Sequence, residues 1–159
     1  MKIVFFLFIF LFALRAFSLD IKCNFEEVYL DGSIQQGFFI IKNKKLRYQY
    51  YDKNLFTIFH KSDDFFIVKN SQISDFQKIN KNTQHIKELL NIASKYPNIK
   101  NEYKNSDIQI NLERNSDSFF KRISIKSPNL NMSIYLQNCK FYSYHDRYFN
   151  YSPYFEFIH

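Results

Sequence analysis

The sequence predicts a mainly β fold: a single curved antiparallel sheet with one midchain amphipathic helix. The first observation is residues 37–79, where the apolar runs FFII, LRYQYY, LFTIF and FFIV alternate with polar turns such as Asn43-Lys44 and Asn70-Ser71. The second is a later segment with helical periodicity, followed by further short strand-like runs. Together they predict about nine or ten strands in one domain.

Residues 1–18 are expected to form a cleavable signal peptide. One lysine precedes an apolar run over residues 3–14, and Ala16 and Ser18 are small, as a signal peptidase requires. The run is shorter than the roughly 20 residues that span a bilayer, which disfavours a membrane anchor. We therefore expect cleavage near Ser18 and a single mature domain, residues 19–159, outside the cytoplasm.

The composition points away from nucleic acids, metals and catalysis. The formal net charge of +7 is scattered over turns and strand edges, as on a solvated surface, and an exported protein seldom meets nucleic acid. There are only two glycines, the four histidines lack zinc-ligand spacing, and neither a GxSxG nor an HExxH motif occurs. We therefore expect no enzyme activity, no metal, no cofactor and no nucleic-acid partner.

The strands on either side of the aromatic segment follow from alternation and turn residues. Ile21, Cys23 and Phe25 alternate with polar residues in the first strand, and Asp31-Gly32 is a strong signal for the hairpin that leads to the strand at Ile34. Beyond the helix, strands are expected over residues 108–112, 119–125, 132–136 and 139–144.

Polar residues within each alternation indicate which face of the sheet is dry. Lys42, Arg47 and Lys69 are expected to face outward into water, so that the alternate positions of their strands face inward. The residues expected inside are Phe39, Ile41, Leu46, Tyr48, Tyr50, Phe56, Ile58, Phe66 and Val68. The residues left on the other face are Phe38, Ile40, Leu55, Phe59, Phe65 and Ile67. That face must therefore be covered as well, or offer an apolar patch to a partner.

The helix is expected from about Thr83 to Lys95, with Asn82 or Thr83 as its cap and Pro97 as its end. Its apolar positions recur at i, i+3, i+4 and i+7, and they are Ile86, Leu89, Leu90 and Ala93. We expect this apolar stripe to face the concave side of the sheet, against some of Phe39, Tyr48, Phe56 and Phe66.

The two cysteines, Cys23 and Cys139, lie in the first strand and in a late one. An oxidising compartment favours a disulfide between them, which would add about 4–5 kcal/mol by closing a long loop. The alternative is a pair of buried free thiols. The spacing excludes a CxxC redox pair.

Four features form a recognisable pattern: Gly37 opening a strand that ends at the basic Lys42, the Arg47–Tyr50 segment, the Ser62–Asp64 turn and the helix with Leu89. In these features the chain resembles a known family, the periplasmic lipoprotein carriers of the LolA type, in which the helix is a lid. The resemblance covers most of the mature chain and implies a half-barrel that carries acylated lipoproteins. It further implies an inner-membrane release complex and an outer-membrane acceptor as partners.

The chain also departs from that family pattern. Asn43-Lys44 stands where the family usually has Arg-Pro, so the arginine that holds the lid closed has no counterpart. Asp64 replaces a glycine, and no amphipathic helix precedes the first strand, which begins near Ile21. The chain therefore resembles a divergent and shortened member.

Two interpretations of the aromatic interior stay open, a packed core and a receptacle for an apolar ligand. For a receptacle, the ligand-binding residues are the nine inward residues of the sheet together with Ile86, Leu89 and Leu90 of the helix. The expected function is then a periplasmic carrier that shields the acyl chains of lipoproteins or other lipids for transfer toward the outer membrane. The alternative is a non-catalytic envelope interaction module that uses the same sheet as a partner-binding scaffold.

Overall fold

The computed structural model describes residues 20–61, 64–79, 84–96, 98–114 and 119–149. The expected signal peptide, the expected helix cap and Pro97 lie outside the described residues. No helix in the described part of the chain is long and apolar enough to cross a membrane.

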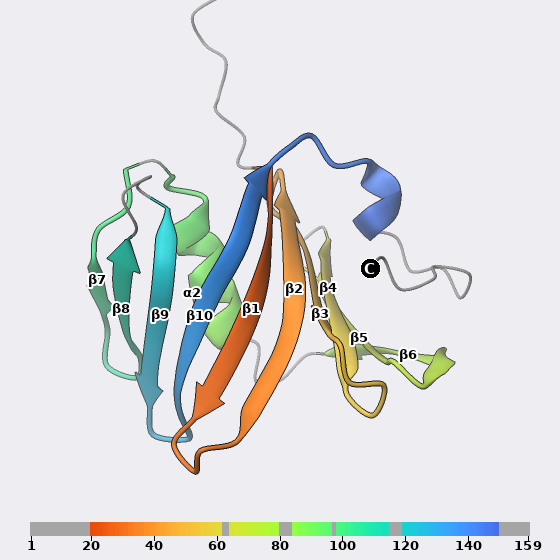
Figure 1. The fold of residues 1–159 in the computed structure, drawn as a ribbon, viewed down its shortest axis with the longest axis horizontal. Helices are drawn as coiled ribbons and strands as arrows, with labels where there is room; N and C mark the ends of the chain where they lie inside the picture. The colour runs from red at the N-terminus through yellow and green to blue at the C-terminus, as the bar shows by residue number, and fades with distance from the viewer. Residues whose placement is uncertain (1–19, 62–63, 80–83, 97, 115–118, 150–159) are drawn as a thin grey trace, which may run out of the picture.

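Ten antiparallel strands form one curved, unclosed sheet, which confirms the predicted fold class (Figure 1). The order across the sheet is β6-β5-β4-β3-β2-β1-β10-β9-β8-β7. In chain order the strands are β1 (Ile21–Tyr29), β2 (Ile34–Lys42), β3 (Lys45–Tyr50), β4 (Phe56–Lys61), β5 (Asp64–Lys69), β6 (Gln72–Ile79), β7 (Glu102–Lys104), β8 (Gln109–Arg114), β9 (Phe120–Ser127) and β10 (Leu130–Phe141). The short edge strand β7 was not expected from the sequence, because its three residues contain no apolar alternation.

The chain builds this sheet from two meanders joined by a helix. Strands β1 to β6 follow one another to one edge, and α2 (Gln84–Ala93) then carries the chain to the opposite edge. Strands β7 to β10 return from that edge until β10 pairs with β1. Because α2 connects opposite edges, it must cross a face of the sheet, and Figure 1 shows it across the concave face.

Two tight turns fix the register of β1, β2 and β3. Gly32 has a φ of 82°, and the Asp31 carboxylate accepts a hydrogen bond from the Ser33 amide at 2.9 Å. Between β2 and β3, Asn43 and Lys44 have φ values of 47° and 65°, the positive pair that a two-residue type I′ hairpin requires. The predicted breaks at Asp31-Gly32 and Asn43-Lys44 are therefore hairpin turns.

The last strand differs from the prediction of two strands at residues 132–136 and 139–144. The structure has one continuous strand, β10, with a bulge at Asn138, whose φ is 51°. The bulge shifts the alternation by one residue, so that Leu136 before it and Cys139 after it both belong to the concave face. The polar pair Gln137-Asn138 thus marks a bulge within a strand and not a turn.

The bulge also lies opposite Cys23 and permits the predicted disulfide. Cys23 and Cys139 are bonded, with their Cα atoms 4.1 Å apart and a sequence separation of 116. Cys23 is fully buried in the main core, next to Ile21 and Phe25 on the same strand. The bond ties the first strand to the last one, where the two meanders meet.

The convex face of the sheet is covered over β2, β3 and β4 by the end of the described chain. Phe149, from the short helix η1 (Asp146–Phe149), forms a second buried cluster with Phe38 and Ile40. Arg47 lies beneath it, 4% exposed, and donates to the Tyr148 carbonyl at 3.3 Å. Burial lowers the pKa of Arg47 to about 10, against a smaller opposite effect of Tyr148.

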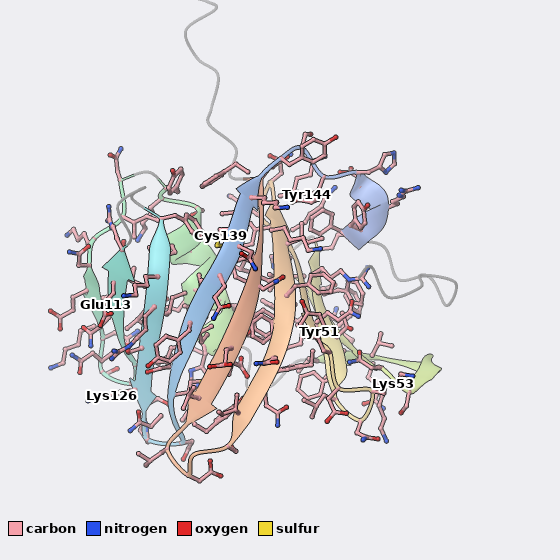
Figure 2. All side chains as sticks on the ribbon, viewed as in Figure 1. Tyr51, Lys53, Glu113, Lys126, Cys139 and Tyr144 are labelled. Atoms are coloured by element: carbon pink, nitrogen blue, oxygen red, sulfur yellow. A yellow bond between two sulfur atoms is a disulfide. The ribbon has the colours of Figure 1, made fainter. Side chains whose placement is uncertain are left out.

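Ion pairs at the rim of the same face anchor η1. Asp146 accepts from Lys42 at 3.1 Å and from Lys45 at 2.9 Å, and Lys42 also donates to the Tyr144 carbonyl. Figure 2 shows Tyr144 beyond the end of β10, where the chain turns toward η1. For Phe38 and Ile40, the structure thus shows that the second apolar face is covered by the chain itself.

Candidate functional site

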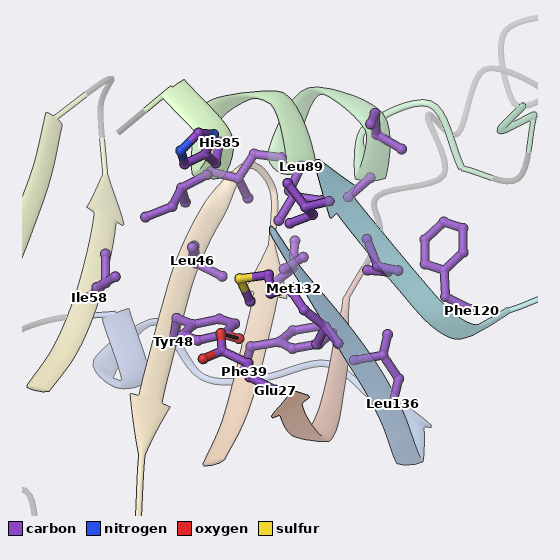
Figure 3. A pocket seen from close by; sticks show the side chains of 18 of the residues that line it. Glu27, Phe39, Leu46, Tyr48, Ile58, His85, Leu89, Phe120, Met132 and Leu136 are labelled. Atoms are coloured by element: carbon purple, nitrogen blue, oxygen red, sulfur yellow. Dashed lines mark hydrogen bonds between the residues drawn. The ribbon is translucent and has the colours of Figure 1, made fainter. Parts of the chain in front are cut away.

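A cavity of about 330 Å³ lies between the concave face of the sheet and α2 (Figure 3). Strands β1 to β4 line one side, β8 to β10 line the other, and α2 forms the roof. The walls are Phe, Tyr, Ile, Leu, Met and Ala side chains with two exceptions, Glu27 on β1 and His85 on α2. The site is therefore an apolar chamber with one acidic group and one imidazole.

Ten of the twelve predicted binding residues line this cavity. They are Phe39, Ile41, Leu46, Tyr48, Tyr50, Phe56, Ile58, Ile86, Leu89 and Leu90. Ala93 and Ile92 of α2 also face the cavity, so the predicted apolar stripe of the helix points toward the concave side. Of the four aromatic residues that the stripe was expected to face in part, Phe39, Tyr48 and Phe56 line the cavity with it, and Phe66 does not.

Phe66 and Val68 do not line the cavity, and the inward assignment of these two residues is wrong. Phe66 pairs with Phe59 and Val68 pairs with Thr57, both on the face that carries Arg47. Paired residues of antiparallel strands share a face, so Phe66 and Val68 belong to the convex side. Phe65 and Ile67, assigned to the outside, consequently belong to the concave side.

The error comes from Lys69, because a charged residue within an alternation is expected to face water and so to place its neighbours inside. Lys69 pairs with Phe56 on the neighbouring strand, and Phe56 lines the cavity, so Lys69 belongs to the concave face of the sheet. It is nevertheless exposed, because it is the last residue of β5. A charged residue at a strand end therefore does not report which face of the strand is dry.

Glu27 is the main feature of the site that the sequence interpretation missed. It is 3% exposed and accepts three hydrogen bonds from tyrosine hydroxyls. Tyr29 donates to Oε2 at 2.7 Å, Tyr50 donates to the same oxygen at 2.9 Å, and Tyr48 donates to Oε1 at 2.5 Å. We call these four residues the tyrosine–carboxylate cluster.

The alternation of β1 contains the signal that would have found this cluster. The predicted alternation of Ile21, Cys23 and Phe25 with polar residues continues to Glu27, and the structure buries all four positions. Across the sheet, Tyr48 and Tyr50 were already placed inside. A carboxylate in phase with buried apolar residues predicts buried donors around it.

Aromatic packing holds the tyrosines of the cluster in place. The Tyr48 ring stacks on Phe25 at a centroid distance of 4.2 Å and lies parallel to Phe39 at 6.3 Å. Tyr50 meets Phe25 edge to face at 5.5 Å and Phe56 at 5.2 Å. The hydroxyls therefore converge on Glu27 from rings that are themselves packed against neighbours.

Burial and the nearby carboxylate keep these hydroxyls protonated. The pKa values of Tyr48, Tyr50 and Tyr29 are raised above the ordinary tyrosine value. Burial of the hydroxyls is the largest cause, and the Glu27 carboxylate raises all three pKa values further. A protonated hydroxyl can donate, so the cluster acts as a set of fixed donors around one carboxylate.

His85 is the second polar group of the cavity, on the first turn of α2. Its Nδ1 is buried and makes no hydrogen bond within the described part of the chain. Figure 3 shows His85 on the helix above Leu46, with Glu27 on the sheet below. The two polar groups thus come from opposite walls of one apolar chamber.

Comparison with known proteins gives no family for this chain. No protein-family model matches it, and no curated protein matches its sequence. Among the described residues, no group of three or more His, Cys, Asp or Glu side chains is placed to hold a metal ion.

Proposed function

We propose that the protein is a non-catalytic periplasmic carrier that shields the acyl chains of lipoproteins or other lipids in the cavity beneath α2, for transfer toward the outer membrane. The observation that carries this proposal is the cavity itself, an apolar chamber of about 330 Å³ between a curved sheet and an amphipathic helix. The disulfide between Cys23 and Cys139 supports an oxidising compartment. The resemblance to the LolA carriers is in accord with this architecture.

The energetics of acyl chains suit such a chamber. Each methylene removed from water contributes about 0.8 kcal/mol, so one long chain supplies on the order of 10 kcal/mol. Pockets for drug-sized ligands run from about 300 to 1,000 Å³, and this cavity lies at the lower end. As it stands the chamber suits a single acyl chain, and a lipid anchor with more chains requires α2 to move.

The burial of α2 suggests how it moves. Ile92 and Ala93 at its C-terminal end are buried, whereas Ile86, Leu89 and Leu90 are only half-buried against the same core. The helix is therefore held more firmly at its C-terminal end than at the end that carries His85. A lid of this kind swings open at His85 while its last turn stays in the core.

An interaction module is the second candidate, because the described sheet is open at both sides. β6 and β7 are its edge strands, and β6 is the longer one, with eight residues. An unpaired strand edge can accept a strand from a partner protein. This function needs no ligand in the cavity, which separates it from the carrier in a binding experiment.

The test is saturable binding of a fluorescent acyl probe by the delipidated mature protein and by a Leu89→Asp variant. Leu89 lines the cavity, and a carboxylate there costs several kcal/mol without contributing to the acyl chain, on the order of a 30-fold or greater loss of affinity. Asn91→Asp is the matched control, because it adds the same charge to the same helix at an exposed position.

The carrier predicts saturable binding that Leu89→Asp removes and Asn91→Asp preserves, with all three proteins folded by circular dichroism. Absence of saturable binding by the unaltered protein contradicts the carrier and favours the interaction module. Unfolding of Leu89→Asp shows that Leu89 is needed for the core, and the unaltered protein then decides the question alone.

A further inference from the structure

The cavity holds a buried acidic side chain without a cationic counterpart. Glu27 is 3% exposed, and no Lys, Arg or His side chain of the described residues forms an ion pair with it. An isolated buried charge is costly, and proteins normally pair it. The three tyrosine hydroxyls offset part of this cost, but they bring no positive charge.

The hydrogen bonds of the cluster leave one position on the carboxylate unoccupied. A carboxylate offers about four lone-pair sites, two on each oxygen. Oε2 accepts from Tyr29 and Tyr50, and among the residues that the structure describes Oε1 accepts from Tyr48 alone. One acceptor site on Oε1 is therefore available to a donor within the cavity.

The surroundings of that site also favour a cation. Tyr48 and Tyr50 line the cavity beside Glu27, together with Phe39 and Phe56. Aromatic faces carry negative potential and attract ammonium groups, more strongly where water is excluded. A carboxylate among aromatic rings is thus complementary to a positive group on an apolar body.

We infer that the cavity selects amphiphiles with a primary ammonium group beside the acyl or alkyl chain, and that Glu27 binds this group. The ammonium donates one hydrogen bond to the open site of Oε1, and the chain extends under α2 along the apolar walls. The inference rests on the proposed function, since it names the chemistry of the ligand for the same cavity. Lipids with a carboxylate or phosphate at that position are repelled by Glu27.

The test compares three ligands of equal chain length that differ in one end group. Dodecylamine, dodecanol and dodecanoic acid are each titrated against a fluorescent acyl probe bound to the delipidated mature protein at neutral pH, below their micelle concentrations or solubility limits. Because removing one partner of a buried, hydrogen-bonded charge pair costs at least about 2 kcal/mol, the amine should bind at least about 30-fold more tightly than the alcohol. The acid should bind most weakly.

Glu27→Gln tests the residue itself, and Glu26→Gln is its matched control. Glu26 is the neighbour on the opposite face of β1, where it accepts from Gln36 at 2.8 Å in an exposed position. Glu27→Gln should abolish the preference for the amine and leave dodecanol binding within a few fold. Glu26→Gln should change neither.

Each outcome separates this inference from the carrier function. If the alcohol or the acid binds the unaltered protein as tightly as the amine, the inference is wrong and the carrier stands. If no ligand displaces the probe because no probe binds, both are wrong. If Glu27→Gln fails to fold, the order of affinities of the amine, the alcohol and the acid for the unaltered protein still decides the inference.

The ammonium group has two natural sources, a free lipid amine and the N-terminal amine of an acylated peptide. A diacylated lipopeptide with a free N-terminus and its N-acetylated counterpart distinguish them. If the lipopeptide with the free N-terminus binds more tightly than the acetylated one, the site is assigned to acylated N-termini. If the two lipopeptides bind equally while dodecylamine still binds more tightly than dodecanol, the site is assigned to lipid amines.

Discussion

Removal of the Tyr50 hydroxyl isolates one hydrogen bond of the tyrosine–carboxylate cluster. Tyr50 donates to Glu27 Oε2 at 2.9 Å, and both residues are buried. The Tyr50→Phe substitution keeps the ring, and with it the edge-to-face contacts to Phe25 and Phe56. The change in the free energy of unfolding therefore reports the hydroxyl and its acceptor.

The expected magnitude follows from the charge on the acceptor. A hydrogen bond to a charged group contributes about 1.5–3 kcal/mol, and a neutral one about 0.5–1.5 kcal/mol. Tyr50→Phe should therefore destabilise the protein by about 1.5–3 kcal/mol with Glu27 present, and by roughly 1 kcal/mol less in the Glu27→Gln background.

The assay is a double-mutant cycle measured by urea unfolding with linear extrapolation. Tyr51→Phe is the control, because the Tyr51 hydroxyl is exposed and lies 3.3 Å from Asn24 Oδ1. It should change stability by no more than about 0.5 kcal/mol. If Tyr50→Phe and Glu27→Gln add within about 0.3–0.5 kcal/mol, the hydroxyl and the carboxylate are not coupled and the reasoning fails.

Two further predictions concern the same region of the sheet. Gly37→Ala should destabilise the fold by about 1–3 kcal/mol, because a Cβ there would lie 2.5 Å from Phe25 Cζ and 2.0 Å from the Gln49 carbonyl oxygen; unchanged urea unfolding would contradict this. The three tyrosines of the cluster should hold their protons above the ordinary pKa of 10.0, so the stability they contribute is complete below pH 10.0 and is lost as the pH rises further. Tyrosinate absorbance checks this, and simultaneous ionisation of all tyrosines near the ordinary value would refute it.

The sequence carried most of the information on the fold because its strands alternate regularly. Gly32 and the Asn43-Lys44 pair mark hairpins by their chemistry, and the apolar stripe that includes Leu89 indicates a helix with one dry face. The expected export and the strand positions of the two cysteines together predicted the bond between Cys23 and Cys139. These features are local, so a single sequence contains them.

Other features depend on contacts between distant segments. The phase of β5 was misread because Lys69 ends the strand, and only the pairing of Phe66 with Phe59 reveals the correct face. The bulge at Asn138 looks like a turn in the sequence, because its partner Cys23 lies far away along the chain. Long-range register was in both cases the missing information.

The cover of the convex face was unpredictable for the same reason. Arg47 was read as an outward, solvated residue, whereas it is buried beneath η1 and makes a hydrogen bond to Tyr148. Phe149 supplies the apolar contact with Phe38 that shields this face. Nothing in the alternation of β3 indicates that a segment about a hundred residues later packs on it.

Native mass spectrometry of the protein purified from the expressing cells without detergent shows directly whether this chamber carries an acylated molecule. The carrier predicts an added mass that dissociates as an acylated molecule, at about one per chain for a chamber of this size. The Leu89→Asp variant should lack it, and Asn91→Asp should retain it. An unaltered protein that carries no such mass, and takes none up from acylated lipid supplied in excess, would contradict the account.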